Sequence, residues 1–149
     1  MNKTQQQIRD YFFSQKDEIC THLKHLMEIK SISDDRKACK EALRYVIRLA
    51  ESFGMKTAVG KHDDVGVIEI GEGRLTLGIL AHVDVVDEGS LAAWNYEPFT
   101  LTEADGMFYG RGIVDDKGPV IVSLYAMKFL LEQVPKFQRK IQLIVGSSE

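Results

Sequence analysis

The chain lacks the features that identify several common classes of protein. None of its uncharged runs approaches the ~20 residues that a membrane helix requires. No basic cluster is large enough to suggest nucleic-acid binding, and the net charge is −3. The first twenty residues contain no apolar segment of the signal-peptide kind. We therefore expect no membrane or nucleic-acid partner and a cytoplasmic location.

Cysteine and the common nucleophile and phosphate motifs are also scarce or missing. Cys20 and Cys39 are the only cysteines, and neither lies in a C-x-x-C or zinc-finger pattern. We expect both to be reduced thiols that are buried or half-buried. The chain has no P-loop spacing and no G-x-S-x-G elbow. These absences disfavour a nucleotide-binding domain and a serine nucleophile at Ser147 or Ser148.

The periodicity of apolar residues predicts the fold class. Apolar residues at steps of three, four and seven predict helices over residues 4–29, 36–53 and 117–134. "MKTAV" and "VGVIEIG" alternate like strands, and "PFTLTEADGMFYG" resembles a hairpin with its turn at Asp105-Gly106. "LTLGILAH" and "KIQLIVG" are typical of buried strands, the first covered on both faces. The order of these segments predicts a single α/β domain with three layers.

A histidine and an aspartate stand at the end of one predicted strand. "LGILAH" delivers His82, and Asp84 follows two residues later on the same face of an extended chain. The histidine could bind a metal through one ring nitrogen while the aspartate accepts a hydrogen bond from the other. The pair could equally be a polar strand end that leaves the core and holds no metal.

A second cluster of polar residues lies in "GRGIVDDKGP", just before a predicted helix. Asp115 and Asp116 could cap that helix, or they could take part in catalysis. Arg111 could anchor either aspartate through charge-assisted hydrogen bonds. The aromatic residues of the preceding loop, Trp94, Tyr96 and Phe99, could line a pocket, but we favour packing of the loop against the sheet.

The last carboxylate of the chain, Glu149, follows the strand "KIQLIVG". Ligand sites in open α/β sheets collect beyond the carboxyl ends of strands. His82, Asp84, Asp115 and Glu149 all follow predicted strands, so a parallel sheet would bring them to one edge. One imidazole and several carboxylates suit Zn²⁺, with Mn²⁺ or Co²⁺ as alternatives.

Four motifs in order, "LGILAHVDVV", "WNYEPFTL", "GMFYGRGIVDDKGP" and "IQLIVGSSE", resemble the dinuclear zinc metallopeptidase and deacylase family. That family includes aminoacylase, acetylornithine deacetylase, succinyl-diaminopimelate desuccinylase and the carnosinase-like bacterial dipeptidases. The resemblance covers residues 75–149. It implies the α/β/α zinc-peptidase-like (phosphorylase/hydrolase-like) catalytic domain, of which this chain would be the N-terminal part.

The resemblance also implies a role for each matching residue. His82 would be a ligand of one zinc ion, and Asp84 would orient His82. Asp115 would bridge both metals, and the Asp115–Asp116 peptide would be cis. Glu149 would be the general base that takes a proton from the attacking water.

Other parts of the family's site have no counterpart in these 149 residues. The second glutamate of the family's pair, a later acidic ligand, a distal histidine and the lid or dimerisation domain are not present. The resemblance therefore implies that residues 1–149 are a truncated, inactive part of the catalytic domain with two of five metal ligands, His82 and Asp115.

The resemblance is strongest to the dipeptidase branch, although Asp87 stands where family members often have proline. Dipeptide hydrolysis is therefore favoured over deacylation of N-acyl amino acids. A further hypothesis from a different class is a non-catalytic module that self-associates through an exposed sheet edge, for which "QLIVG" is the candidate strand.

Overall fold

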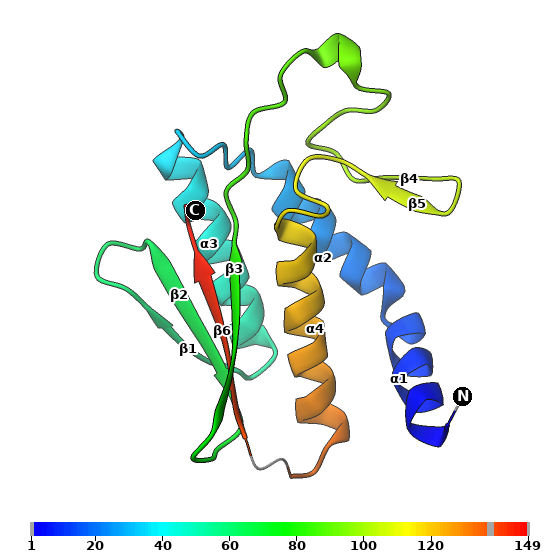
Figure 1. The fold of residues 1–149 in the computed structure, drawn as a ribbon, viewed down its shortest axis with the longest axis vertical. Coiled ribbons are helices and arrows are strands. Elements are labelled where there is room, and N and C mark those ends of the chain that lie inside the picture. The colour runs from blue at the N-terminus through cyan, green and yellow to red at the C-terminus, as the bar shows by residue number, and fades with distance from the viewer. Residues whose placement is uncertain (1, 137–138, 149) are drawn as a thin grey trace.

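The computed structural model describes residues 2–136 and 139–148. Helices and one sheet form the body of the molecule, and a long loop with a small hairpin extends beyond one end of the sheet (Figure 1). The helices are α1 (Lys3–Ser14), α2 (Lys16–Glu28), α3 (Arg36–Ser52) and α4 (Lys117–Gln133), and a short 3-10 helix, η1, covers Leu91–Ala93. The predicted α/β class is confirmed.

The four-stranded sheet is mixed. Its strands are β1 (Lys56–Val59), β2 (Val65–Ile70), β3 (Thr76–His82) and β6 (Lys140–Gly146), in the order β1-β2-β6-β3. β3 and β6 are parallel, whereas β2 runs antiparallel to both β1 and β6. β6 is therefore a central strand, and its residues Ile141, Leu143 and Val145 are buried, as predicted for "KIQLIVG".

The N-terminal helix differs from its prediction. The expected single helix over residues 4–29 is two helices, α1 and α2, which meet at Gln15. The apolar stripe has a polar gap between Phe13 and Ile19, so no buried contact continues it through this turn. α1 buries no residue, but its Tyr11 and Phe12 contact the ring of Phe129 on α4.

The strand "LTLGILAH" is also less covered than predicted. β3 lies at the edge of the sheet beside β6, and its side chains are mostly exposed, with Leu77 at 51% and Leu80 at 79%. The expectation that both its faces are covered is wrong within the described residues, because α2, α3 and α4 pack on one face (Figure 1). The two edge strands of the sheet are β1 and β3. "QLIVG" lies in β6, which has a neighbouring strand on each side, so it is not the exposed edge.

The core lies between the helices and the covered face of the sheet. It joins α3 and α4 to β2 and β6, with Leu43, Val46, Ile68, Leu124 and Leu143 fully buried. Such a core holds the carboxyl ends of β3 and β6 against the starts of α3 and α4. The end of the sheet at which the predicted site residues lie is therefore attached to the best-packed part of the molecule.

The remaining predictions from the sequence can be compared directly. The hairpin of β4 (Thr102–Ala104) and β5 (Met107–Tyr109) turns at Asp105 and Gly106, both with positive φ, as predicted. Both thiols are free, Cys20 half-buried and Cys39 buried. No helix within the described residues is long and apolar enough to cross a membrane.

Candidate metal centre

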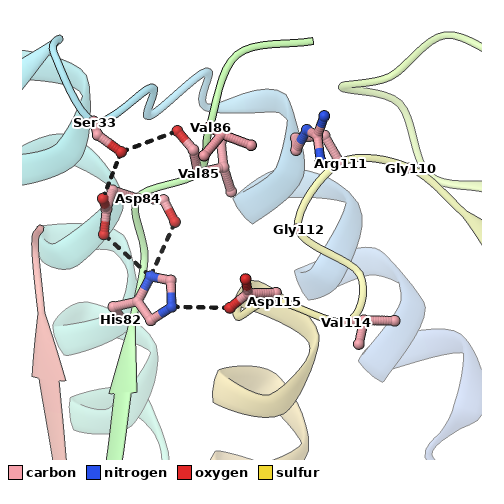
Figure 2. A pocket seen from close by; sticks show the side chains of 10 residues that line it. All are labelled: Ser33, His82, Asp84, Val85, Val86, Gly110, Arg111, Gly112, Val114 and Asp115. Atoms are coloured by element: carbon pink, nitrogen blue, oxygen red, sulfur yellow. Dashed lines mark hydrogen bonds and ion pairs between the residues drawn. The ribbon is translucent and has the colours of Figure 1, made fainter. Parts of the chain in front are cut away.

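A small cavity opens at the carboxyl end of β3. Its volume is about 190 Å³, and its polar lining includes Ser33, His82, Asp84, Arg111 and Asp115 (Figure 2). Three segments supply these side chains: the α2–α3 connection, the end of β3 with the extended chain that follows it, and the loop before α4. The structure thus brings together three of the four predicted site residues. The fourth, Glu149, lies outside the described residues.

His82 is the centre of this arrangement. Its Nδ1 lies 3.1 Å from both the main-chain oxygen and Oδ1 of Asp84, and its Nε2 lies 3.0 Å from Oδ1 of Asp115 (Figure 2). Burial of the ring lowers its pKa, but the contact with Asp115 and the charges of Asp84 and Asp116 outweigh burial and raise the pKa above 6.5. A cation is therefore favoured between Nε2 and Asp115, whether a proton or a metal ion.

Asp84 is the buried member of the cluster. Its side chain is 4% exposed, and its Oδ2 accepts a hydrogen bond of 2.7 Å from the Ser33 hydroxyl. The segment that carries Asp84 pairs with the α2–α3 connection through a parallel bridge between Ile32 and Val85. This carboxylate is held on two sides and directed at Nδ1 of His82. Sequence reasoning missed Ser33, although the S-x-S spacing of Ser31 and Ser33 was visible.

Asp115 and Asp116 differ from each other in role. The peptide between them is cis, as the family resemblance implied. The Asp115 side chain is 80% exposed and faces His82. Asp116 occupies the N-cap position of α4 without a capping hydrogen bond, and its Oδ2 accepts a bond of 3.1 Å from the main-chain nitrogen of His82. Helix capping by the Asp116 side chain is therefore wrong.

The route by which Asp115 reaches the site also differs from the prediction. Asp115 belongs to the loop that follows the separate β4–β5 hairpin, so no strand of the main sheet delivers it. His82 and Asp84, at and just beyond the end of β3, match the expectation of residues at the end of a parallel strand. In the structure, the loop reaches His82 because α4 starts beside the end of β3.

Lys117, directly after the two aspartates, is fully buried. Its ammonium group donates hydrogen bonds to the main-chain oxygens of Leu26, at 3.0 Å, and Ile29, at 2.6 Å. Burial lowers its pKa to about 8, against the opposing charges of Cys39 and Asp84. These bonds tie the start of α4 to the end of α2, where free carbonyl groups attract a cation. "DDKGP" contains this lysine, but nothing in the sequence shows that it points inward.

Arg111 has a different partner from the one expected. Its guanidinium donates to the main-chain oxygen of Asp87 at 3.0 Å and lies 5.1 Å from the ring centre of Trp94. It therefore fastens the long loop, and among the described residues it makes no hydrogen bond to either aspartate. Phe99 is buried beneath Lys30, and Tyr96 packs on Tyr109 of the hairpin. Trp94 and Tyr96 thus pack the loop on Arg111 and on the hairpin, and Phe99 packs it on the α2–α3 connection.

The donor atoms fit part of a metal site. Two ligands of a tetrahedral zinc ion, each about 2.0–2.1 Å from the metal, lie roughly 3.3 Å apart. The separation of 3.0 Å between Nε2 of His82 and Oδ1 of Asp115 is close to that value. Within the described residues, no group of three histidine, cysteine or acidic side chains gathers around one point. His82 and Asp115 could thus hold a metal from one side, with Asp84 behind the histidine.

Comparisons with known proteins relate the chain to a family of peptidases. Residues 78–149 match the model of peptidase family M20/M25/M40. A Staphylococcus epidermidis protein named "Putative dipeptidase" is 40% identical over 136 residues, which cover 85% of this chain and 28% of that protein. A Staphylococcus saprophyticus protein of the same name is 37% identical over 150 residues, 95% of this chain and 31% of its own length. The chain thus spans less than a third of these relatives.

Solved structures share the fold. Human carnosine dipeptidase 1 superposes with a TM-score of 0.82 at 25% identity, over 95% of this chain and 34% of that chain. An M20 family metallo-carboxypeptidase from Sulfolobus solfataricus gives a TM-score of 0.77 at 26% identity, over 87% and 30%. The family match, the relatives and the shared fold confirm the resemblance seen in the sequence, and residues 78–149 carry part of a peptidase family M20/M25/M40 domain.

Proposed function

We propose that residues 1–149 form the N-terminal part of the catalytic domain of a zinc-dependent dipeptidase. The observation that carries the proposal is the row Asp84–His82–Asp115, in which a buried carboxylate backs an imidazole whose other nitrogen faces an exposed carboxylate. This row is a typical arrangement for a histidine ligand, because the carboxylate fixes the tautomer and ring orientation. Two zinc ions per complete site are proposed, with Mn²⁺ or Co²⁺ as alternatives.

Each residue has a defined task in this proposal. When bound, the metal would supply polarisation of the scissile carbonyl and activation of the attacking water. His82 and Asp115 hold that cation, and Asp84 keeps the proton of His82 on Nδ1 so that Nε2 remains a ligand. Glu149, outside the described residues, is proposed as the base that accepts a proton from the water.

The proposed substrate is a dipeptide. Both relatives named above carry the word dipeptidase, and human carnosine dipeptidase 1 shares the fold. An N-acyl amino acid remains the alternative substrate class within the wider resemblance. We also propose a cytoplasmic location, which suits two free thiols, and self-association through the exposed edge of β3.

Metal titration of the purified chain tests the proposal. We expect Co²⁺ or Zn²⁺ binding by calorimetry, lost in His82→Ala and retained in His62→Ala, whose histidine lies in an exposed loop. Equal binding by His82→Ala and the wild type would contradict the site. We further expect a dipeptide to perturb the visible spectrum of the Co²⁺-loaded chain more than an N-acetyl amino acid does; the reverse order would favour the deacylase alternative.

Turnover is a separate question for this chain. The described residues supply two protein ligands, whereas a catalytic zinc site usually has three. We therefore expect weak metal binding and no hydrolysis of either substrate by the 149-residue chain. Hydrolysis at an ordinary enzymatic rate, about 1–10³ per second, would contradict that expectation.

A further inference from the structure

We propose that Ser33 is a positioning residue of the metal centre, which acts by orienting the carboxylate of Asp84 behind His82. The inference rests on the proposed function, because it assumes that His82 is a metal ligand. Ser33 belongs to neither the family motifs nor the matched residues 78–149. It reaches the cavity from the α2–α3 connection, 51 residues away from Asp84 in the chain.

The hydrogen-bond geometry assigns the hydroxyl proton to Asp84. A serine hydroxyl has one proton to donate. The Ser33 oxygen lies 2.7 Å from Oδ2 of Asp84 and 3.3 Å from the main-chain oxygen of Val85. The shorter contact has a charged acceptor and is the stronger bond. Figure 2 shows the resulting row of side chains from Ser33 through Asp84 and His82 to Asp115.

The main chain places Ser33 for this contact. The nitrogen of Val85 donates to the oxygen of Ser31 at 2.9 Å, and the nitrogen of Ser33 donates to the oxygen of Val85 at 3.1 Å. The hydroxyl of Ser31 bonds the main-chain oxygen of Val83 at 2.6 Å, whereas that of Ser33 bonds the Asp84 side chain.

The orientation of the carboxylate determines the orientation of the imidazole. With Oδ2 held by Ser33, Oδ1 is directed at Nδ1 of His82, 3.1 Å away. A carboxylate that could rotate would leave the ring freer to tilt and to exchange its proton between Nδ1 and Nε2. Ser33 therefore favours the tautomer in which Nε2 is the metal-binding atom, and it does so from a segment attached to the helices.

Ser31→Ala is a matched control for Ser33→Ala. Both variants remove one hydroxyl from the same short segment, but Ser31 is fully buried and bonds the main chain, whereas Ser33 bonds the carboxylate. A merely structural role would give Ser31→Ala the larger effect on the site. Ser33→Thr keeps the hydroxyl and serves as the rescue variant.

The first measurement uses the metal-free chain. Two-bond ¹H–¹⁵N NMR of the neutral His82 ring reports which nitrogen carries the proton. We expect Nδ1 to be protonated in the wild type, in Ser33→Thr and in Ser31→Ala, and the two ¹⁵N shifts of Ser33→Ala to move toward each other as tautomers mix. Unchanged shifts in Ser33→Ala, or equal changes in Ser31→Ala, would overturn the proposal.

The second measurement is Co²⁺ affinity together with the visible spectrum of the bound ion. Loss of a partner behind a metal-binding histidine typically weakens affinity by 10–100-fold, and we expect about tenfold for Ser33→Ala because it acts through Asp84. Wild-type affinity in Ser33→Ala would overturn the inference and leave the proposed function intact. No Co²⁺ binding by the wild type would contradict the proposed function, while the metal-free NMR still decides the role of Ser33.

Discussion

The two carboxylates that flank His82 differ sharply in their surroundings. The side chain of Asp84 is 4% exposed and is held by Ser33, whereas that of Asp115 is 80% exposed. Asp84 lies in an extended segment that pairs with the α2–α3 connection, and Asp115 lies in a loop that ends at the start of α4. One side of the imidazole is therefore enclosed by protein, and the other faces the cavity.

This difference suggests a division of labour. A ligand that must approach a fixed ring nitrogen needs an open side, and the ring needs a rigid support on its other side. The enclosed side is organised before any metal arrives, because its hydrogen bonds are all within the chain. On the open side, Asp115 contacts His82 directly, and a cation could join or replace that contact. Variants on the two sides should consequently affect different properties.

The largest effect is expected from removing the enclosed carboxylate. Asp84→Ala takes away a buried acceptor of Ser33 and His82, and breaking such a buried charged contact costs about 3–5 kcal/mol. Asp115→Ala, on the exposed side, should change the free energy of unfolding by less than about 0.5 kcal/mol while it weakens metal binding. Urea denaturation measures both values. Equal destabilisation by the two variants would show that the sides do not differ as described.

A second effect concerns the buried ammonium group of Lys117 beneath the site. Its pKa is about 8 in the folded chain and near 10.5 when exposed, so the unfolded state binds more protons between these values. The free energy of unfolding should therefore rise with pH across this window, by about 3 kcal/mol from this group, and the penalty of burying the charge is complete below pH 8.

Lys117→Met isolates this contribution. The rise between about pH 8 and 10.5 should disappear in the variant, and urea denaturation across that range measures it. Lys40→Met is the control, because Lys40 also donates to a main-chain oxygen, that of His62, but lies at the surface. It should keep the wild-type pH dependence. A Lys117→Met chain with an unchanged rise would mean that the ammonium group is not the source.

A smaller effect should come from Gly112, in the loop before α4. Its φ is +89°, and an added Cβ would lie 3.1 Å from both Lys117 and Val85. Gly112→Ala should lower the unfolding free energy by about 2 kcal/mol, from backbone strain and crowding together. Gly106, at the hairpin tip, has a φ of +74° and no atom near an added Cβ. Gly106→Ala should cost about 1 kcal/mol, and an equal or larger loss would show that crowding at Gly112 is unimportant.

The sequence predicts His82 and the two carboxylates beside it better than it predicts the residues that support them. His82, Asp84 and Asp115 are recognisable because polar residues interrupt apolar runs and stand in motifs. Ser33 and Lys117 are not recognisable in this way, since their roles depend on contacts with residues 51 and 91 positions away. Serine and lysine are usually solvent-exposed, so local composition gives no sign of an inward direction.

The fold shows the same limit. Helices and strands with a clear period appear where predicted, including the Asp105-Gly106 turn. The division of the N-terminal helix at Gln15 and the exposure of β3 at the sheet edge depend on what packs against each segment. An apolar run such as "LTLGILAH" has the same pattern in a covered strand and in an edge strand, so its neighbours cannot be inferred from its own residues.

The smallest predicted effect lies on the open side and concerns the protonation of His82. Burial lowers the pKa of the ring, but the Asp115 contact and the charges of Asp84 and Asp116 raise it above 6.5. A raised folded-state pKa contributes stability that is complete below the unfolded value and is lost as pH rises through the folded value. Asp115→Asn removes the negative charge from the contact with Nε2, so the pKa of His82 should fall and the stability that depends on it should diminish.

The change should be modest, because Asp115 is exposed and solvent screens its charge. NMR titration of the His82 ring protons in the metal-free chain measures the pKa directly, and Asp63→Asn, which removes an acidic group paired with Arg44, is a control that should leave it unchanged. An unchanged or higher pKa in Asp115→Asn would mean that Asp84 and Asp116 alone hold the proton. The open carboxylate would then contribute little to cation binding at Nε2, and the proposed role of Asp115 as a metal ligand would be weakened.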